Sequence, residues 1–306
     1  MSQKSTTTKI KEDFRHNWQL YLIVSPVIIF FLIFSYAPMA GIVMAFQNYS
    51  IAGGIFGSEW VGLQHFRDFF GSMQFPRLMR NTFLLSFYDL LLNFPAAIIF
   101  ALLMNELRNL KFKRVIQTIS YMPFFISMVV VAGIIMNFFS STGAMTMLIS
   151  SLGGPSGNLM GQAGMFRSIF VGTNLWQNIG FNSIIYMAAL AGIDQEQYEA
   201  ATIDGANRLK QTLYVTLPGL APTITIMFIL RVGNLLTVNF EKVLLLYSPA
   251  TFETADVIST FVFRRGLLQL DYGFSTAVGL FNSVIALVLI LAANFVARKT
   301  SETSLF

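Results

Sequence analysis

Six apolar runs, each long enough to cross a lipid bilayer as a helix, dominate the 306-residue sequence. The runs lie at about residues 20–45, 82–104, 115–139, 168–191, 220–246 and 274–297. A bilayer offers backbone groups no hydrogen-bonding partner, so a segment that crosses it folds as a helix or joins a closed barrel, and runs of this length indicate helices. We therefore predict an all-α integral membrane protein with six transmembrane helices.

The composition supports this class of protein. Only 11% of the residues are charged and 55% are hydrophobic, whereas a soluble domain has about 25% charged residues. The absence of cysteine excludes disulfides and thiolate metal sites, and His16 and His65 are expected in loops or at the membrane interface rather than at a metal. The net charge of +5 does not indicate a nucleic-acid partner, because the basic residues form no patch interleaved with aromatic residues.

The distribution of Lys and Arg predicts the orientation in the membrane, because these residues concentrate in cytoplasmic loops. With both termini in the cytoplasm, the inner segments hold 12 of the 20 Lys and Arg residues and the outer segments hold six. We therefore predict cytoplasmic N- and C-termini. The domain organisation that follows is a cytoplasmic segment at 1–18 and one six-span membrane domain at 19–306, which contains a long inner loop at 194–218.

That inner loop, DQEQYEAATIDGANRLKQTLYVTLP, is polar and lies between two apolar runs. Asp194 can cap a first short helix, with Gln197 as its capping-box partner, and Gly205 can end that helix in the left-handed conformation. Asn207 can cap a second short helix before the Leu-Pro pair turns the chain back into the membrane. The pattern predicts two short helices that meet at Gly205 and offer small residues to a partner. A plain loop with an interfacial amphipathic helix is the alternative.

The same loop carries a spaced signature of Glu-Ala-Ala, Gly, an aliphatic residue and Leu-Pro, formed by Glu199, Ala200, Ala201, Gly205, Val215, Leu217 and Pro218. This spacing resembles the cytoplasmic loop of the membrane subunits of binding-protein-dependent ATP-binding-cassette (ABC) importers. The resemblance implies the type I ABC importer permease fold, with cytoplasmic coupling helices that dock on an ATPase. It assigns ATPase coupling to Glu199, Ala200, Ala201, Asp204, Gly205, Leu217 and Pro218.

Further stretches resemble the permeases of importers for oligosaccharides and polysaccharide fragments: WQLYLIVSP, YAPMAGIVMAFQNYS, WVGLQHF and FKRVIQTISYMPFFIS. This resemblance implies a protein of the bacterial cytoplasmic membrane that forms half of a translocation pathway for a sugar. It also implies three kinds of protein partner: a dimer of cytosolic ABC ATPases, a second and different homologous permease subunit, and an extracellular or periplasmic sugar-binding protein.

The chain contains no G-x-x-x-x-G-K-[ST] phosphate-binding loop, and no Ser-His-Asp or paired-carboxylate arrangement stands out. We therefore expect no enzyme activity and no cofactor in this chain, with ATP and Mg²⁺ held by the partner ATPase. Three alternatives stay open: a secondary transporter driven by an ion gradient, an importer permease for a solute other than a sugar, and a membrane scaffold or exporter component.

Polar side chains inside the fourth run predict part of a substrate path, because such residues usually face the bundle interior or a water-filled cavity. Asn174, Asn178 and Asn182 recur every four residues, with Trp176 and Gln177 beside them. Amides both donate and accept hydrogen bonds, which suits the hydroxyl groups of a sugar. The alternative is that these amides join neighbouring helices to one another.

The fifth run adds a polar stripe to the predicted path. In one continuous helix, Arg231, Asn234, Glu241 and Lys242 would fall within about one third of the circumference. Among aromatic residues in and near the spans, Tyr121 is a candidate for contact with a sugar ring. Arg231 has alternative roles, in gating or in an ion pair with Glu241 or a partner subunit.

Overall fold

The computed structural model describes residue 14 and residues 16–300, which are almost entirely helical. Two short strands, β1 (Gln47–Asn48) and β2 (Glu59–Trp60), form one antiparallel pair. The helical elements are α2 (Trp18–Phe31), η1 (Leu32–Tyr36), η2 (Ala37–Phe46), α3 (Gly54–Gly57), α4 (Gln64–Gly71), α5 (Phe75–Glu106), α6 (Leu110–Tyr121), η3 (Met122–Phe125), α7 (Met128–Phe138), α8 (Ala144–Ser151), η4 (Leu159–Gly161), α9 (Ala163–Ala191), α10 (Gln195–Ile203), α11 (Arg208–Gln211), η5 (Thr212–Thr216), α12 (Leu217–Gly233), α13 (Phe240–Leu246), η6 (Pro249–Thr251), α14 (Phe252–Ala255), α15 (Ile258–Phe263), η7 (Arg264–Leu268) and α16 (Tyr272–Thr300).

Four of the described helices are long and apolar enough to cross a membrane: Trp18–Phe46, Phe75–Glu106, Arg208–Gly233 and Tyr272–Lys299. They contain the first, second and sixth predicted spans and the first part of the fifth, so the predicted all-α membrane class is confirmed. The fourth predicted span is the 29-residue α9, which is not among these four and carries several Asn and Gln side chains.

The third predicted span, 115–139, is not one straight helix. The segment Leu110–Phe125 and helix α7 meet at a bend of 100°. Pro123 is the second residue of the short turn η3, and Ser127 then caps a new helix, with its Oγ accepting a hydrogen bond from the Val130 N–H at 3.5 Å. The cause is local: proline interferes with the hydrogen bonds of a helix, and a serine cap favours a new helix start.

The fifth predicted span, 220–246, is wrong in its second half. Its helix begins earlier, at Arg208, and ends at Gly233. The chain is non-helical until Asn239, whose side chain caps α13 by accepting from the Lys242 N–H at 3.1 Å. The predicted stripe is therefore divided between two helices, with Glu241 in α13 rather than on the face of α12 that carries Arg231.

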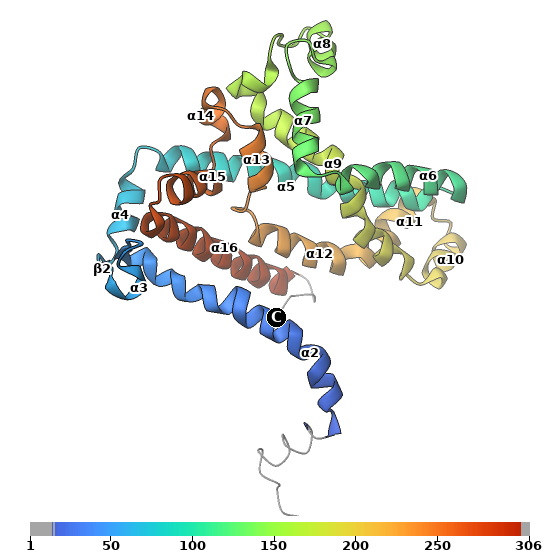
Figure 1. Ribbon diagram of the computed structural model, residues 1–306. Helices are drawn as coiled ribbons and strands as arrows, with labels where there is room; N and C mark the ends of the chain where they lie inside the picture. Colours follow the sequence, from blue (N-terminus) through green and yellow to red (C-terminus); the bar gives the residue numbers. More distant parts are fainter. Residues whose placement is uncertain (1–13, 15, 301–306) are drawn as a thin grey trace, which may run out of the picture.

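The long helices pack as a bundle around α9 (Figure 1). Helix α5 runs along α9, which also contacts α6 and α12, while α12 packs against α16. Helix α6 comes very close to α9 at Gly180, where a Cβ atom would overlap the backbone of Ser120. The apolar side chains of Leu190 and Leu220 are buried between α5, α9 and α12. Helices α5, α9 and α12 thus surround the region in which the predicted polar residues lie.

The first part of the first long helix, α2, stands apart from this bundle, whereas its last part, η2, packs against α16. Figure 1 shows α2, in blue, extending away from the other helices. None of the most apolar window of Trp18–Phe46 is buried within the chain, and Ile23 is 71% exposed. Lipid or a second subunit therefore has to cover α2 in the membrane. The predicted N-terminal segment 1–18 lies mostly outside the described residues.

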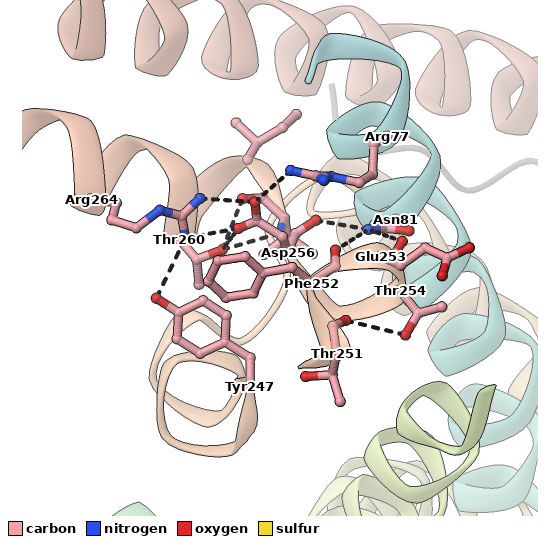
Figure 2. Close-up of polar contacts among 12 residues, drawn as sticks. Arg77, Asn81, Tyr247, Thr251, Phe252, Glu253, Thr254, Asp256, Thr260 and Arg264 are labelled. Atoms are coloured by element: carbon pink, nitrogen blue, oxygen red, sulfur yellow. Dashed lines mark hydrogen bonds and ion pairs between the residues drawn. The ribbon is translucent and has the colours of Figure 1, made fainter. Parts of the chain in front are cut away.

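A buried carboxylate organises the end of the molecule at which α5 begins. Asp256 is fully buried, and its two oxygens accept hydrogen bonds from Arg264 at 3.0 and 2.8 Å. The Thr260 hydroxyl donates to the same carboxylate at 3.0 Å, and Arg77 of α5 lies 3.5 Å from it. Figure 2 shows these side chains converging on Asp256. We call Arg77, Asn81, Asp256, Thr260 and Arg264 the Asp256 cluster.

Asn81 joins α5 to two other parts of the chain. Its amide nitrogen donates to the backbone carbonyls of Phe252, Glu253 and Asp256 at 3.5, 3.0 and 3.0 Å (Figure 2). Its amide oxygen accepts a hydrogen bond from Arg167 of α9 at 2.7 Å. The side chain is fully buried, so the Asp256 cluster fixes α14, α15, α5 and α9 to one another by hydrogen bonds.

The polar loop lies at the opposite end of α5. Glu106, the last residue of α5, accepts a hydrogen bond from Arg208 at 2.6 Å. Asn81 and Glu106 are about 38 Å apart along this one helix, at roughly 1.5 Å per residue. A distance of this size exceeds the hydrocarbon thickness of a bilayer, about 30 Å. The Asp256 cluster and the polar loop therefore belong to opposite ends of the bundle.

Candidate translocation cavity and coupling loop

A cavity of about 370 Å³ lies between α5, α9 and the end of α12, away from both ends of α5. Amide side chains dominate its polar lining. The lining residues are Leu85, Ser86, Asp89, Leu90, Asn93, Phe94, Phe170, Asn174, Asn178, Asn182, Arg231, Asn234, Leu235, Thr237, Val238 and Asn239. Because each amide can donate and accept, the cavity can bind a solute that carries many hydroxyl groups.

One carboxylate of the cavity is compensated within the chain. Asp89 Oδ1 accepts hydrogen bonds from the side-chain nitrogens of Asn93 and Asn174. Asn178 in turn donates to the backbone and side-chain oxygens of Asn174, both at 2.9 Å. The ammonium group of Lys242 also attracts the Asp89 charge. We call Asp89, Asn93, Asn174 and Asn178 the Asp89 network; it joins α5 to α9 across the cavity wall.

Arg231 differs from Asp89 in having no such compensation. It is exposed to the cavity from the last turn of α12. Among the residues that the structure describes, no carboxylate lies within 4.0 Å of its guanidinium and no side-chain hydrogen bond to it is found. Arg231 also lines a second cavity of about 200 Å³, next to Ala97 and Met227. It therefore stands where the two cavities meet.

The backbone between α12 and α13 contributes directly to the larger cavity. Leu235, Thr237 and Val238 of the non-helical segment line it, together with the flanking Asn234 and Asn239. Non-helical backbone at membrane depth is tolerated only where it is buried in protein or lines a water-filled cavity. Substrate sites of membrane transporters commonly form at such interrupted helices. The break is thus a second, independent indication of a solute site.

The structure brings together five of the residues that the sequence predicted for the substrate path. Asn174, Asn178, Asn182, Arg231 and Asn234 all line the larger cavity. Sequence reasoning missed Ser86, Asp89, Asn93, Thr237 and Asn239. Asp89 and Asn93 are four residues apart in the second span, so the polar spacing that revealed the amides of the fourth run could also have revealed these two.

The other four predicted path residues lie elsewhere. Trp176 lines a separate, apolar cavity of about 500 Å³ beside α7. Gln177 is buried, and the Tyr121 hydroxyl lies 4.0 Å from the Met187 sulfur rather than in the larger cavity. Glu241 is exposed at the start of α13. Neither cavity that contains Arg231 includes any of these four side chains.

The polar loop forms the predicted helix pair, with two differences. Asp194 caps α10 by accepting from the Glu196 N–H at 3.0 Å, and Asn207 caps α11 by accepting from Lys210. Gly205 has φ +74°, the predicted left-handed conformation. The predicted reciprocal bond from the Gln197 side chain is not found among the described residues.

The second helix does not stop at the Leu-Pro pair. Helix α11 continues through the wider turn η5 into α12, so Arg208–Gly233 is one helix. The Leu217 N–H bonds to the Thr212 carbonyl, one residue further back than in a regular α-helix. This wider turn accommodates Pro218, which lacks a backbone N–H. Helix α11 is therefore continuous with the helix that carries Arg231.

The loop is held by internal hydrogen bonds but exposes apolar groups. The Tyr198 and Thr216 hydroxyls are 3.0 Å apart, and Gln211 donates to Thr202 at 3.0 Å. In contrast, the apolar side chains of Ile203 and Tyr214 are 86% and 77% exposed. All of the residues assigned to ATPase coupling lie in this loop; most are exposed, and Ala201 and Leu217 are partly buried.

A helical membrane bundle with a polar cavity at an interrupted helix, and a capped polar loop at one end, defines the membrane subunit of a transporter. Residues 93–301 match the family described as binding-protein-dependent transport system inner membrane component. The chain belongs to this family. It is therefore a multi-pass membrane component of a binding-protein-dependent transport system, and the likeness favours an importer permease over a secondary transporter.

Individual relatives cover nearly the whole chain. Protein LplB of Bacillus subtilis is 44% identical, over 95% of this chain and 92% of that protein. The polygalacturonan/rhamnogalacturonan transport system permease protein YteP of Bacillus subtilis is 40% identical, over 94% and 90%. A solved bacterial alginate ABC transporter, in complex with an alginate pentasaccharide-bound periplasmic protein, has a chain that is 42% identical, with a TM-score of 0.88 over 96% of this chain and 99% of that one. This likeness confirms the ABC importer permease fold.

Proposed function

We propose that this chain forms half of the translocation pathway for an oligosaccharide or polysaccharide fragment. The observation that carries the proposal is the amide-lined cavity at the break between α12 and α13. A solute rich in hydroxyl groups needs hydrogen-bond donors and acceptors in one place, and clustered amides supply both. The name of YteP and the alginate cargo of the solved transporter support a sugar as the solute.

Energy for transport comes, in this proposal, from a dimer of cytosolic ATPase subunits that hold ATP and Mg²⁺. The polar loop docks on them through Glu199, Ala200, Ala201, Asp204 and Gly205, with Leu217 and Pro218 at its membrane end. The exposed Ile203 and Tyr214 support a docking role, because apolar side chains on a polar loop gain free energy when a partner covers them. The unbroken helix Arg208–Gly233 would carry the movement to the cavity.

The orientation and the remaining partners follow from this docking. The polar loop and both termini face the cytoplasm, and the end with the Asp256 cluster faces outward, where an extracellular or periplasmic sugar-binding protein delivers the solute. A second, homologous permease subunit completes the pathway. The exposure of Trp18–Phe46 supports a neighbour for this chain in the membrane, which consists of that subunit together with lipid.

A substitution at Gly205 tests the docking. Valine is strongly disfavoured at positive φ because it is β-branched, so Gly205→Val should distort the junction of α10 and α11. We expect loss of ATPase co-purification and of uptake. Gly153→Val is the matched control, because Gly153 has φ +82° and, like Gly205, has open space around its Cβ position. Full ATPase association of Gly205→Val would contradict the docking assignment.

The sugar assignment has its own test. The complete importer is reconstituted with its binding protein, and ATPase activity is measured with a panel of oligosaccharides and with non-sugar solutes. We expect stimulation by at least one oligosaccharide. Stimulation by non-sugar solutes alone would contradict the sugar assignment and leave the permease role intact.

A further inference from the structure

Arg231 is a cation for which the described chain supplies no counter-charge. Arg231 lines the larger cavity, together with the amides of Asn182 and Asn234 and the apolar ring of Phe94. Amides can share hydrogen bonds with a guanidinium, but they do not neutralise it. An ionised side chain within the membrane is costly unless water or an opposite charge accompanies it.

The other charges near the cavity do not provide the missing partner. Asp89 is the only carboxylate among the described lining residues. Its Oδ1 accepts from Asn93 and Asn174, and its charge is attracted by Lys242. Lys242 itself is fully buried, with its ammonium donating to the Phe170 carbonyl at 3.4 Å and lying 5.2 Å from the Phe170 ring centroid. The Asp89 carboxylate is thus hydrogen-bonded to amides of the chain, whereas Arg231 has no hydrogen-bond or ion-pair partner for its side chain among the described residues.

The end of helix α12 explains why a cation is tolerated at this position. It does not explain why the guanidinium has no hydrogen-bond partner among the described residues. Arg231 lies in the last turn of α12, where the partial negative charge of the helix end favours a positive side chain. That field acts on the charge as a whole and leaves the N–H donors of the guanidinium available. These donors form a planar fork that matches the two oxygens of a carboxylate.

We propose that Arg231 binds a carboxylate of the transported solute, so that the cargo is an acidic oligosaccharide containing uronic acid residues. A uronic acid ring carries hydroxyl groups and one carboxylate on the same unit. The amides of Asn174, Asn182 and Asn234 bind the hydroxyl groups, while Arg231 binds the carboxylate. Because Arg231 lines both the larger cavity and the smaller one toward Ala97 and Met227, successive units of the chain pass the same cation.

This inference rests on the proposed sugar transport and makes it more specific. The test uses the complete importer in proteoliposomes, with one binding protein throughout. The two probes are an oligouronate of fixed length and its fully methyl-esterified form, which has the same hydroxyl groups and no charge. Since the binding protein is the same in every experiment, a change in the ratio of the two uptake rates between variants reports on the permease.

We expect the unaltered importer to take up the acid faster than the ester. Arg231→Gln should reduce uptake of the acid about ten-fold or more, as expected when a charged hydrogen-bonding partner is lost, and should leave uptake of the ester within about two-fold. Arg231→Lys should retain part of the preference, because it keeps the charge and loses the fork. Preserved ester uptake also shows that the variant is folded and assembled.

Three results would overturn the inference. One is an equal loss of acid and ester uptake in Arg231→Gln, which would place Arg231 in an ion pair with the second permease subunit. Another is unchanged acid uptake in that variant. The third is a preference of the unaltered importer for the ester. If no oligosaccharide is taken up at all, the proposed function fails as well.

A binding protein that does not deliver the ester requires a second measurement. Binding of both probes to the purified permease pair is then measured directly, without the binding protein. Selective loss of acid binding in Arg231→Gln supports the inference, and identical acid binding in the variant and the unaltered protein contradicts it.

Discussion

The Asp256 cluster and the cavity around Arg231 both contain an arginine and an aspartate, but only the cluster pairs them. Arg264 donates to both oxygens of Asp256, and the pair is completed within one chain. Burial lowers the pKa of the Arg264 guanidinium, yet its hydrogen bonds to Asp256 and Tyr247 outweigh burial and raise the pKa. Arg231, by contrast, shares a cavity with Asp89 without a bond to it among the described residues.

This difference distinguishes polar groups that stabilise the fold from polar groups that can bind a solute. The Asp256 cluster joins α5, α9, α14 and α15 at one end of the bundle, and the chain itself supplies hydrogen-bond partners for its central carboxylate and for the amide of Asn81. The side-chain donors of Arg231 have no partner among the described residues and face the cavity of about 370 Å³. Substitutions in the cluster should therefore change stability first, and substitutions in the cavity should change transport first.

The largest effect on stability is expected for Asp256→Ala. Removing this fully buried carboxylate leaves Arg264 (24% exposed) and Arg77 (41% exposed) without their shared counter-charge, at a cost of up to about 3–5 kcal/mol, the range for fully buried pairs. The measurement is thermal or denaturant unfolding of the purified protein in detergent. Asp271→Ala is the matched control: the ion pair of Asp271 with Arg265 is partly exposed, so its loss should cost less than about 1 kcal/mol. An equal loss of unfolding free energy in the two variants would contradict the distinction between the buried cluster and the partly exposed ion pair.

An intermediate effect is expected for Asn81→Ala. The fully buried amide serves three carbonyl oxygens and Arg167, so its removal leaves buried polar groups unpaired, at a cost of about 1–3 kcal/mol. Asn182→Ala, in the cavity, removes an amide that has no side-chain hydrogen bond among the described residues. Its unfolding midpoint should stay close to that of the unaltered protein. Similar destabilisation by both substitutions would contradict the division of roles.

The smallest effect on stability is expected for Glu106→Ala, next to the polar loop. The pair of Glu106 with Arg208 has a short distance of 2.6 Å, but the two side chains are 47% and 56% exposed. Solvent screening limits an exposed pair to about 0–1 kcal/mol. We therefore expect an unchanged unfolding midpoint at moderate salt. A large loss of stability would show that the loop is held mainly by this pair rather than by its caps and internal hydrogen bonds.

Much of the fold could be predicted from the sequence, because apolar runs of bilayer length permit few structures. The breaks could not be placed in this way. Pro123 and Ser127 favour a break locally, and Asn234 permits one, but such residues also occur inside continuous membrane helices. The sequence alone therefore does not decide whether the helix continues. The left-handed Gly205 and the caps at Asp194 and Asn207 were predictable, since they depend on local backbone geometry alone.

The candidate site was predictable in part for a similar reason. The spacing of Asn174, Asn178 and Asn182 places them on one face of a helix in any packing, and all three line the cavity. The bond between Asn174 and Asp89 joins residues 85 positions apart, so only the tertiary structure reveals it. Glu241 was assigned to the wrong surface because its position depended on a helix that is interrupted.

The most direct test of the division of roles is the uptake rate of Asn182→Ala, normalised to the amount of assembled importer, with Asn81→Ala measured beside it. Asn182 lines both cavities that contain Arg231. We predict that Asn182→Ala lowers oligosaccharide uptake by about three-fold or more, as expected for the loss of a hydrogen bond, while its unfolding midpoint is unchanged. Asn81→Ala should lower the midpoint and keep the rate per assembled importer. An unchanged uptake rate in Asn182→Ala would contradict a solute path through this cavity.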